Sequence, residues 1–295
     1  MADPQKGQGS RERLSVSLPP KNKGVLPIGA RPFFLRLPFL PALVYYLGNT
    51  LMEDLMKRAI TFGIVAAATA MAGCGEARSE NGGPVVDRTY QVAGFDRIAL
   101  AGAYNTTVRT GAAPGVRAHG NQKAIDNLEV EVKDGILVIR HKSRMGFSWG
   151  SSHGKVTLDV TVPSLRGAEL AGSGDINIDK VAGDSFDGAI AGSGNLKLAK
   201  VEVGKLKLSI AGSGNASAGS GRAKSAEYDI AGSGGIDAKG VAVETAAVSI
   251  AGSGDVAGQA STTASVDIMG SGNVEMTGGA KCTVSKAGSG SARCS

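Results

Sequence analysis

The chain has 295 residues, of which 44 are glycine and 4% are aromatic, and its formal net charge is +6. The excess positive charge lies at the front, because residues 1–73 carry nine Lys and Arg against four Asp and Glu, whereas residues 74–295 carry 23 against 22. The larger part has neither a basic stripe nor aromatic residues interleaved with basic ones, so the sequence predicts no nucleic-acid partner.

Residues 1–55 are rich in proline and basic residues and show neither a helical nor a strand period. Because the segment that follows has the features of a signal peptide, which begins a chain, we expect residues 1–55 to be a disordered upstream extension from a start codon assigned too early. Met52 or Met56 would then be the first residue. The alternative is a membrane anchor over residues 33–47, but Arg36 and two prolines interrupt that run and it is short for a span.

Residues 56–73 have the parts of a lipoprotein signal peptide: a short basic region, an apolar stretch and small residues directly before Cys74. Residues 71–74 resemble a bacterial lipobox, although Met71 replaces the usual leucine. This resemblance implies that Cys74 is lipidated and anchors the mature chain to a membrane. A secretory peptide with an accidental cysteine and an N-terminal membrane helix remain as alternatives. Residues 74–84 are polar and are expected to form a flexible tether.

Residues 85–165 alternate apolar and polar residues over several short segments, which is typical of strands. The strand segments are 97–101, 105–110, 128–140 and 155–162, and a short helical turn fits residues 122–127. Asp134 and Gly135 predict a hairpin within 128–140. These irregular strands are expected to form the first coils and the cap of a solenoid, because a terminal repeat must cover a core that would otherwise face water.

One segment within this region is a candidate recognition loop, residues 143–153. It carries the chain's only tryptophan, Trp149, together with Arg144, Phe147 and His153 among small residues. Exposed aromatic residues on such loops often bind sugars or proteins. The alternative is that Phe147 and Trp149 fold back and cover the open end of the solenoid.

Residues 165–295 form a tandem array built on the triplet Gly-Ser-Gly. The central serines are Ser173, Ser193, Ser213, Ser233, Ser253, Ser271 and Ser289. Their steps of 20 residues, shortening to 18, indicate a solenoid. Period-two alternation before each triplet marks a strand, and the glycines mark a corner. The sequence therefore predicts an all-β fold, a right-handed parallel β-helix over residues 85–295 with irregular N-terminal cap strands.

Alignment of the repeats places apolar residues in columns that predict the core. The first column contains Ile190, Ile210, Ile230, Ile250 and Ile268. A polar column follows each triplet and contains Asp175, Asn195, Asn215, Gly235, Asp255, Asn273 and Ser291. Asn and Asp tolerate left-handed backbone, so we expect this column to form part of the corner and to stack as a ladder. A calcium repeat would need a nine-residue step and paired carboxylates, so we predict no metal site and no cofactor.

An enzyme active site is the main alternative reading of the array. Glu169, Asp229 and Asp267 share one outward column, and Asp229 and Asp267 are two coils apart, a spacing compatible with a loosely placed glycosidase pair. Serine or alanine fills the other places in that column. The three histidines, His119, His141 and His153, lack the spacing of zinc ligands. No catalytic residue is therefore predicted.

Cys282 and Cys294 lie twelve residues apart near the end of the array. Export to an oxidising compartment would favour a disulfide between them, which would close the last coil. Free thiols are the alternative.

The Gly-Ser-Gly array, preceded by a strand-rich segment such as Phe95-Asp96-Arg97-Ile98, resembles the bacterial head GIN domain family, described as heads of auto-transporter adhesins. The resemblance covers about residues 88–285. It implies a β-helical surface module, often on exported lipoproteins, and supplies no catalytic residues. We therefore expect a non-enzymatic, lipid-anchored envelope protein that contacts a cell-surface polysaccharide or protein. In a cell with two membranes, Gly75 after the lipidated cysteine would favour the outer membrane. A polysaccharide lyase or glycosidase and a purely structural envelope component remain as alternatives.

Overall fold

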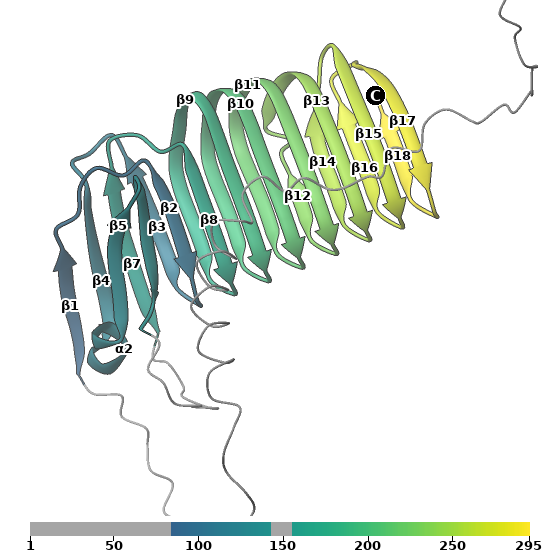
Figure 1. Cartoon of the computed structure of the whole chain (residues 1–295). Coiled ribbons are helices and arrows are strands. Elements are labelled where there is room, and N and C mark those ends of the chain that lie inside the picture. The colour runs from purple at the N-terminus through teal and green to yellow at the C-terminus, as the bar shows by residue number, and fades with distance from the viewer. Residues whose placement is uncertain (1–83, 143–154) are drawn as a thin grey trace, which may run out of the picture. The chain divides into compact units, whose positions relative to one another are not determined.

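The computed structural model of the protein describes residues 84–142 and 155–295. These residues form a parallel β-helix whose coils stack from β8 to β18. The cap strands lie at the end of the stack away from β18 (Figure 1). The all-β, parallel β-helical fold expected from the sequence is confirmed.

The first part of the fold contains seven strands and one short helix. They are β1 (Val85–Tyr90), β2 (Arg97–Ala101), β3 (Asn105–Thr110), β4 (Gly115–Asn121), α2 (Gln122–Asp126), β5 (Leu128–Lys133), β6 (Ile136–His141) and β7 (Val156–Val162). The solenoid proper follows. Its strands are β8 (Gly167–Gly172), β9 (Asp175–Gly192), β10 (Asn195–Gly212), β11 (Asn215–Gly232), β12 (Gly235–Asp237), β13 (Val241–Gly252), β14 (Asp255–Gln259), β15 (Thr263–Gly270), β16 (Asn273–Thr277), β17 (Lys281–Ala287) and β18 (Ser291–Cys294).

The coils are joined by parallel pairing at a fixed register. Asn195 pairs with Asp175 and Asn215 with Asn195, one coil of 20 residues apart, and later coils shorten to the 18 residues between Asp255 and Asn273. β2 and β3 already belong to this stack, because Leu100 pairs with Leu170 and Asn105 with Asp175. Residues 100–105 are therefore a first copy of the repeat corner.

Close backbone approach at each corner explains the glycines. Gly212, the first glycine of its triplet, has φ +134°, and a Cβ atom there would lie 2.3 Å from the carbonyl oxygen of Gly192 in the preceding coil. That same carbonyl oxygen accepts hydrogen bonds from the backbone N–H groups of Ser213 and Gly214, each at 3.0 Å. A side chain would therefore break the contact that stacks one coil on the next.

The expectation that the polar column adopts left-handed backbone is wrong. Asp134, in the turn between β5 and β6, is the one non-glycine residue with positive φ in the described ranges 84–142 and 155–295. Asp175, Asn195 and Asn215 instead begin strands β9, β10 and β11 and pair in parallel with their neighbours. The first glycine of each triplet has positive φ and turns the corner. The residue that follows the triplet is therefore extended.

The core is a thin stack of inward-facing columns in which large and small residues compensate. The isoleucine column from Ile190 to Ile268 is buried, as expected. Tyr228 is fully buried, and Gly258 on the facing wall lies where a Cβ atom would be 3.4 Å from the Tyr228 ring. The Tyr228 hydroxyl has no hydrogen-bond partner among residues 84–142 and 155–295, and burial raises its pKa.

Cys282 and Cys294 are joined by a disulfide, with a Cα–Cα distance of 6.5 Å. Cys282 continues the inward column of Ala264, and Cys294 continues that of Met276. The bridge therefore links two walls across the interior of the last described coil.

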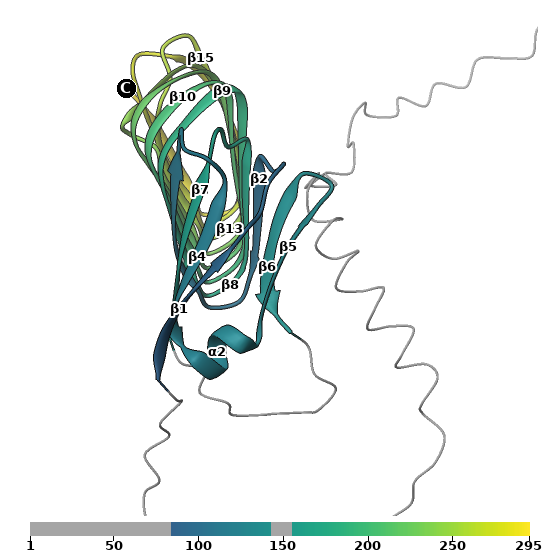
Figure 2. The same ribbon diagram turned by 90° about the vertical axis from the view of Figure 1, so that its left-hand side faces the viewer.

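Antiparallel strands and α2 close the N-terminal end (Figure 2). β1 pairs with β4 and β4 with β7, while β5 and β6 form the hairpin that Asp134 and Gly135 predict. The helical turn expected at 122–127 is α2, whose Ile125 is fully buried against the core.

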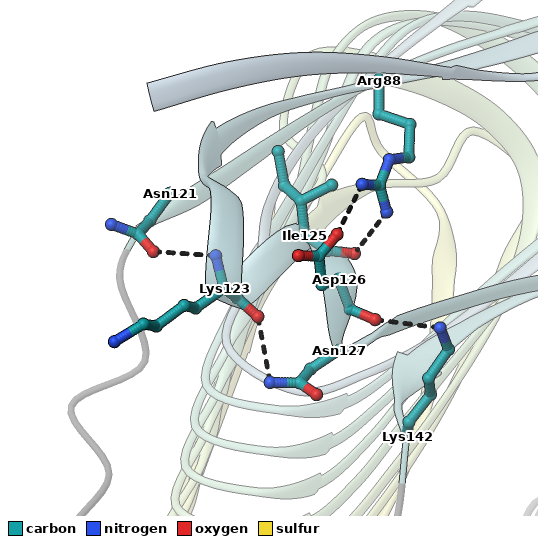
Figure 3. A network of polar contacts seen from close by, with 7 residues as sticks. All are labelled: Arg88, Asn121, Lys123, Ile125, Asp126, Asn127 and Lys142. Carbon is teal, nitrogen blue, oxygen red and sulfur yellow. Dashed lines mark hydrogen bonds and ion pairs between the residues drawn. The ribbon is translucent and has the colours of Figure 1, made fainter. Parts of the chain in front are cut away.

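Polar contacts hold α2 on the end of the stack (Figure 3). The side chain of Asn121 accepts a hydrogen bond from the Lys123 backbone N–H at 3.1 Å and so caps the helix N-terminus. Arg88 from β1 pairs with Asp126, and Lys142 Nζ donates to the Asp126 carbonyl oxygen at 2.9 Å. These contacts join β1, α2 and the segment after β6.

We predict that Gly212→Ala destabilises the fold more than Gly183→Ala. Both glycines have φ +134°, so each substitution costs roughly 1–3 kcal/mol of backbone strain. A Cβ at position 183 meets nothing within 4 Å, whereas one at 212 meets backbone, which adds about 2 kcal/mol. Urea unfolding of both variants measures the difference, and equal losses would contradict the corner-contact explanation.

We also predict that Tyr228→Phe raises the free energy of unfolding by about 1 kcal/mol, because it keeps the ring and removes a buried hydroxyl to which no described residue is hydrogen-bonded. Urea unfolding of the wild-type chain and the variant measures this change. A loss of stability on this substitution would mean that the hydroxyl has a favourable contact.

Candidate functional site

Several residues singled out in the sequence lie outside the described part of the chain. These are the lipidation candidate Cys74 and the recognition-loop residues Arg144, Phe147, Trp149 and His153. Their roles stay predictions.

The carboxylate column expected on the outer face is confirmed by the register. Glu169 is followed coil by coil by Ala189, Ser209, Asp229, Ser249 and Asp267. Asp229 is not a free carboxylate, because its Oδ2 lies 3.0 Å from Lys207 Nζ. Lys207 also donates to Glu227, which accepts in addition from Lys205 Nζ at 2.9 Å. The centre of this face is therefore a network of paired charges.

Titration of this face follows from burial and pairing. Burial raises the pKa of Glu169 and of Asp187, against the lowering effect of the nearby Arg97. Burial acts to lower the pKa of Lys207, but its hydrogen bonds to Glu227 and Asp229 outweigh this and the pKa is raised. Lys207 therefore stays a cation that neutralises its two carboxylate partners.

The described histidines contact separate groups. His119 Nδ1 lies 3.0 Å from Asp87 Oδ1, and His141 Nδ1 lies 2.9 Å from the Lys142 carbonyl oxygen. Across residues 84–142 and 155–295, no three His, Cys, Asp or Glu side chains are placed to share a metal ion. Within the same residues, no helix is long and apolar enough to cross a membrane.

The polar column after each triplet forms a hydrogen-bonded ladder, as the sequence predicts. Asn195 Nδ2 donates to Asp175 Oδ1 at 2.7 Å, and Asn215 Nδ2 donates to Asn195 Oδ1 at 3.2 Å. Further along the stack, Asn273 Nδ2 donates to Asp255 Oδ1 at 2.9 Å. Between these two runs the ladder is interrupted at Gly235, which has no side chain.

A groove of about 590 Å³ lies over this interruption. Its lining comes from β11, β12, β14, β16 and β18, with Lys239 between β12 and β13. Lys239 reaches across two coils, and its Nζ lies 2.9 Å from Glu275 Oε2. Asp237 and Arg293 also line the groove. It is therefore a polar hollow on the second half of the stack.

A second groove, of about 770 Å³, lies at the bend between the walls. Glu202 on its rim is bound by Lys200 at 2.9 Å and Lys180 at 3.0 Å, which together lower the pKa of Glu202 to about 2. Arg222 is the coil-to-coil neighbour of Glu202, yet forms no ion pair with the described residues. Asp184, Lys224 and Glu244 add both signs of charge.

Two features of these surfaces were not found by reading the sequence. Lys207 and Asp229 stand in different columns of the repeat. The repeat alignment therefore shows that they lie close together, but not that they form an ion pair. Gly235 is visible in the alignment as a missing polar side chain, but its effect depends on which atoms of Asn215 and Asp255 face the gap.

Comparison with known proteins supports the fold and gives the family. The family described as "Putative auto-transporter adhesin, head GIN domain" matches residues 94–280. No curated protein is significantly similar to the chain.

Solved structures of bacterial proteins share the fold. An adhesin-like protein of Bacteroides fragilis, described as a putative adhesin, is 22% identical with a TM-score of 0.65, covering 72% of this chain and 97% of that one. A protein of Parabacteroides distasonis, described as a putative lipid binding protein, is 25% identical with a TM-score of 0.59, again covering 72% and 97%. Because the family match covers more than half of the sequence, the chain belongs to this head GIN domain family.

Proposed function

We propose that this protein is a non-enzymatic, exported lipoprotein that presents its β-helix for adhesion to cell-surface or envelope polymers, polysaccharide or protein. The observation that carries the proposal is family membership over residues 94–280, in a fold built as a rigid stack of coils. A rigid stack presents long walls of outward side chains whose positions are fixed by the backbone register, which suits recognition of a polymer.

The outer walls favour binding over catalysis. Of the carboxylates that could form a glycosidase pair, Asp229 is ion-paired to Lys207 at 3.0 Å. This Asp229 oxygen is therefore occupied by a contact within the protein rather than turned toward a substrate. The walls carry polar and charged side chains that suit contact with a hydrated polymer.

The tether would set the orientation of the stack. Val85, which begins β1 in the cap, comes eleven residues after Cys74, so the tether reaches at most about 40 Å when extended. A lipid on Cys74 would therefore hold the cap end near the membrane, the outer membrane in a cell with two. The coils from β12 onward lie toward the end of the stack away from the cap (Figure 1). They and the 590 Å³ groove that they help to line would then be the part farther from the lipid.

We predict that the chain expressed in a bacterial host with lipoprotein processing carries a lipid on Cys74 and sediments with membranes. Cys74→Ser should move it to the soluble fraction, because the serine hydroxyl does not replace the thiol in the thioether to the lipid. Cys282→Ser is the matched control and should remain in the membrane fraction. Mass spectrometry of the mature N-terminus provides the readout, and a first residue other than Cys74 would contradict the anchor.

We predict further that the purified full chain is retained on isolated envelope polysaccharide without shortening it. Pull-down measures retention, and assays for new reducing ends and for unsaturated sugar products measure cleavage. Retention without new ends is the expected result. New reducing ends that grow with time and disappear in Asp229→Ala would show an enzyme, and absence of retention on envelopes and whole cells would argue for a structural component.

A further inference from the structure

The polar ladder has one empty rung, at Gly235. In each filled run, a side chain donates to the Oδ1 atom of the preceding residue, as Asn215 does to Asn195. At Gly235 no side chain follows Asn215. The position where a Cβ would lie at Gly235 is 3.1 Å from Asn215 Oδ1, so this acceptor faces the empty rung. No described residue donates a hydrogen bond to it.

The far side of the empty rung is also an acceptor. Asp255 begins the next run, and its Oδ1 accepts from the backbone N–H of Asn273 at 3.1 Å and from Asn273 Nδ2 at 2.9 Å. Asn273 thus occupies Oδ1, whereas no described residue donates to Asp255 Oδ2, and this second carboxylate oxygen is the acceptor left beside the gap. An oxygen acceptor thus borders the empty rung on each side. A ligand that fills the empty rung must therefore donate two hydrogen bonds.

The size of the rung fits a small group with two donors. Asn215 and Asp255 pair with Gly235 from opposite sides, so their backbones are two coil spacings apart, about 9.6 Å. The gap opens into the 590 Å³ groove, where the Lys239–Glu275 ion pair forms a rim and Asp237 adds another carboxylate. The gap is therefore accessible from a hollow large enough for part of a polymer chain.

We propose that the empty rung at Gly235 binds adjacent hydroxyl groups of a sugar residue in a neutral polysaccharide, one donating to Asn215 Oδ1 and one to Asp255. This inference rests on the proposed adhesive function and assigns it a site. The groove is lined by three carboxylates against two cations, so like-charge repulsion disfavours a uronate-containing polymer. The carboxylates are Asp237, Asp255 and Glu275, and the cations are Lys239 and Arg293. A single hydroxyl fills only one of the two acceptors, so a polymer without adjacent free hydroxyls should bind less well.

The test is affinity electrophoresis of the full chain in gels that contain dextran, polygalacturonate or soluble chitin oligosaccharides. Dextran leaves adjacent hydroxyls free on each glucose, whereas polygalacturonate is anionic and chitin carries an acetamido group in place of one hydroxyl. Dextran should retard the wild-type protein most.

Gly235→Asn is the decisive variant, because it supplies the side chain that the repeat has at this rung and fills the gap from within. It should weaken dextran retardation about tenfold or more, as expected when hydrogen bonds to a charged acceptor are lost. The thermal unfolding temperature should not fall. Asp255→Asn keeps the size of the side chain but replaces its carboxylate with an amide. This variant should weaken retardation independently of Gly235→Asn. Asp175→Gly, which breaks the contact of Asn195 Nδ2 with Asp175 Oδ1 outside the groove and leaves the contact between Asn195 and Asn215 in place, is the matched control and should leave retardation unchanged.

The outcomes separate the site from the function. If Gly235→Asn folds and is retarded by dextran as strongly as the wild type, the empty rung is not the site, although adhesion stands. If the wild type binds envelopes but is not retarded by dextran, or is retarded more by polygalacturonate than by dextran, the proposed ligand is wrong. If it binds neither envelopes nor dextran, the adhesive function fails together with the site.

Discussion

The structure depends on one close contact, the approach of successive coils at the Gly-Ser-Gly corner. The carbonyl oxygen of Gly192 lies 2.3 Å from the position that a Cβ of Gly212 would take. It accepts hydrogen bonds from two backbone N–H groups of the next coil. This contact fixes the height and rotation of each coil relative to the last. This register aligns every column of side chains from coil to coil. The arrangement of the core and of the outer faces therefore depends on a corner that tolerates no side chain.

The same register makes the thin core possible. Columns bring residues one coil apart into contact, so a large residue at one level must be balanced by a small one nearby. Tyr228 fits because Gly258 leaves space on the facing wall. At the last described coil, Cys282 and Cys294 occupy the inward positions. Their disulfide joins the two walls covalently, whereas packed core side chains hold the walls together in the other coils. The cap does this at the other end with α2 and Ile125.

Much of this architecture could be predicted from sequence because the repeat records it directly. The corner, the isoleucine column and the polar ladder follow from counting 20 residues, whereas the copy of the corner at residues 100–105 pairs with residues 70 positions later, outside the regular step. The antiparallel pairing of β1 with β4 could not be predicted, since cap strands pair by long-range contacts without a repeat. The backbone of Asp175 and its equivalents was predicted wrongly, because residue preference alone does not show which residue of a corner makes the turn.

A repeat that places the same side chain on every coil gives a uniform surface, so selective recognition requires a position where the repeat changes. Not every change has this effect. Ser291 replaces asparagine in the ladder, yet its Oγ donates to Asn273 Oδ1 at 2.7 Å and keeps the run continuous. Gly235 alone among the aligned rungs from Asp175 to Ser291 lacks a side chain. Decay of the repeat would also produce a glycine, but decay does not require that the Asn215 acceptor face the gap, within a groove and on the half of the stack away from the cap.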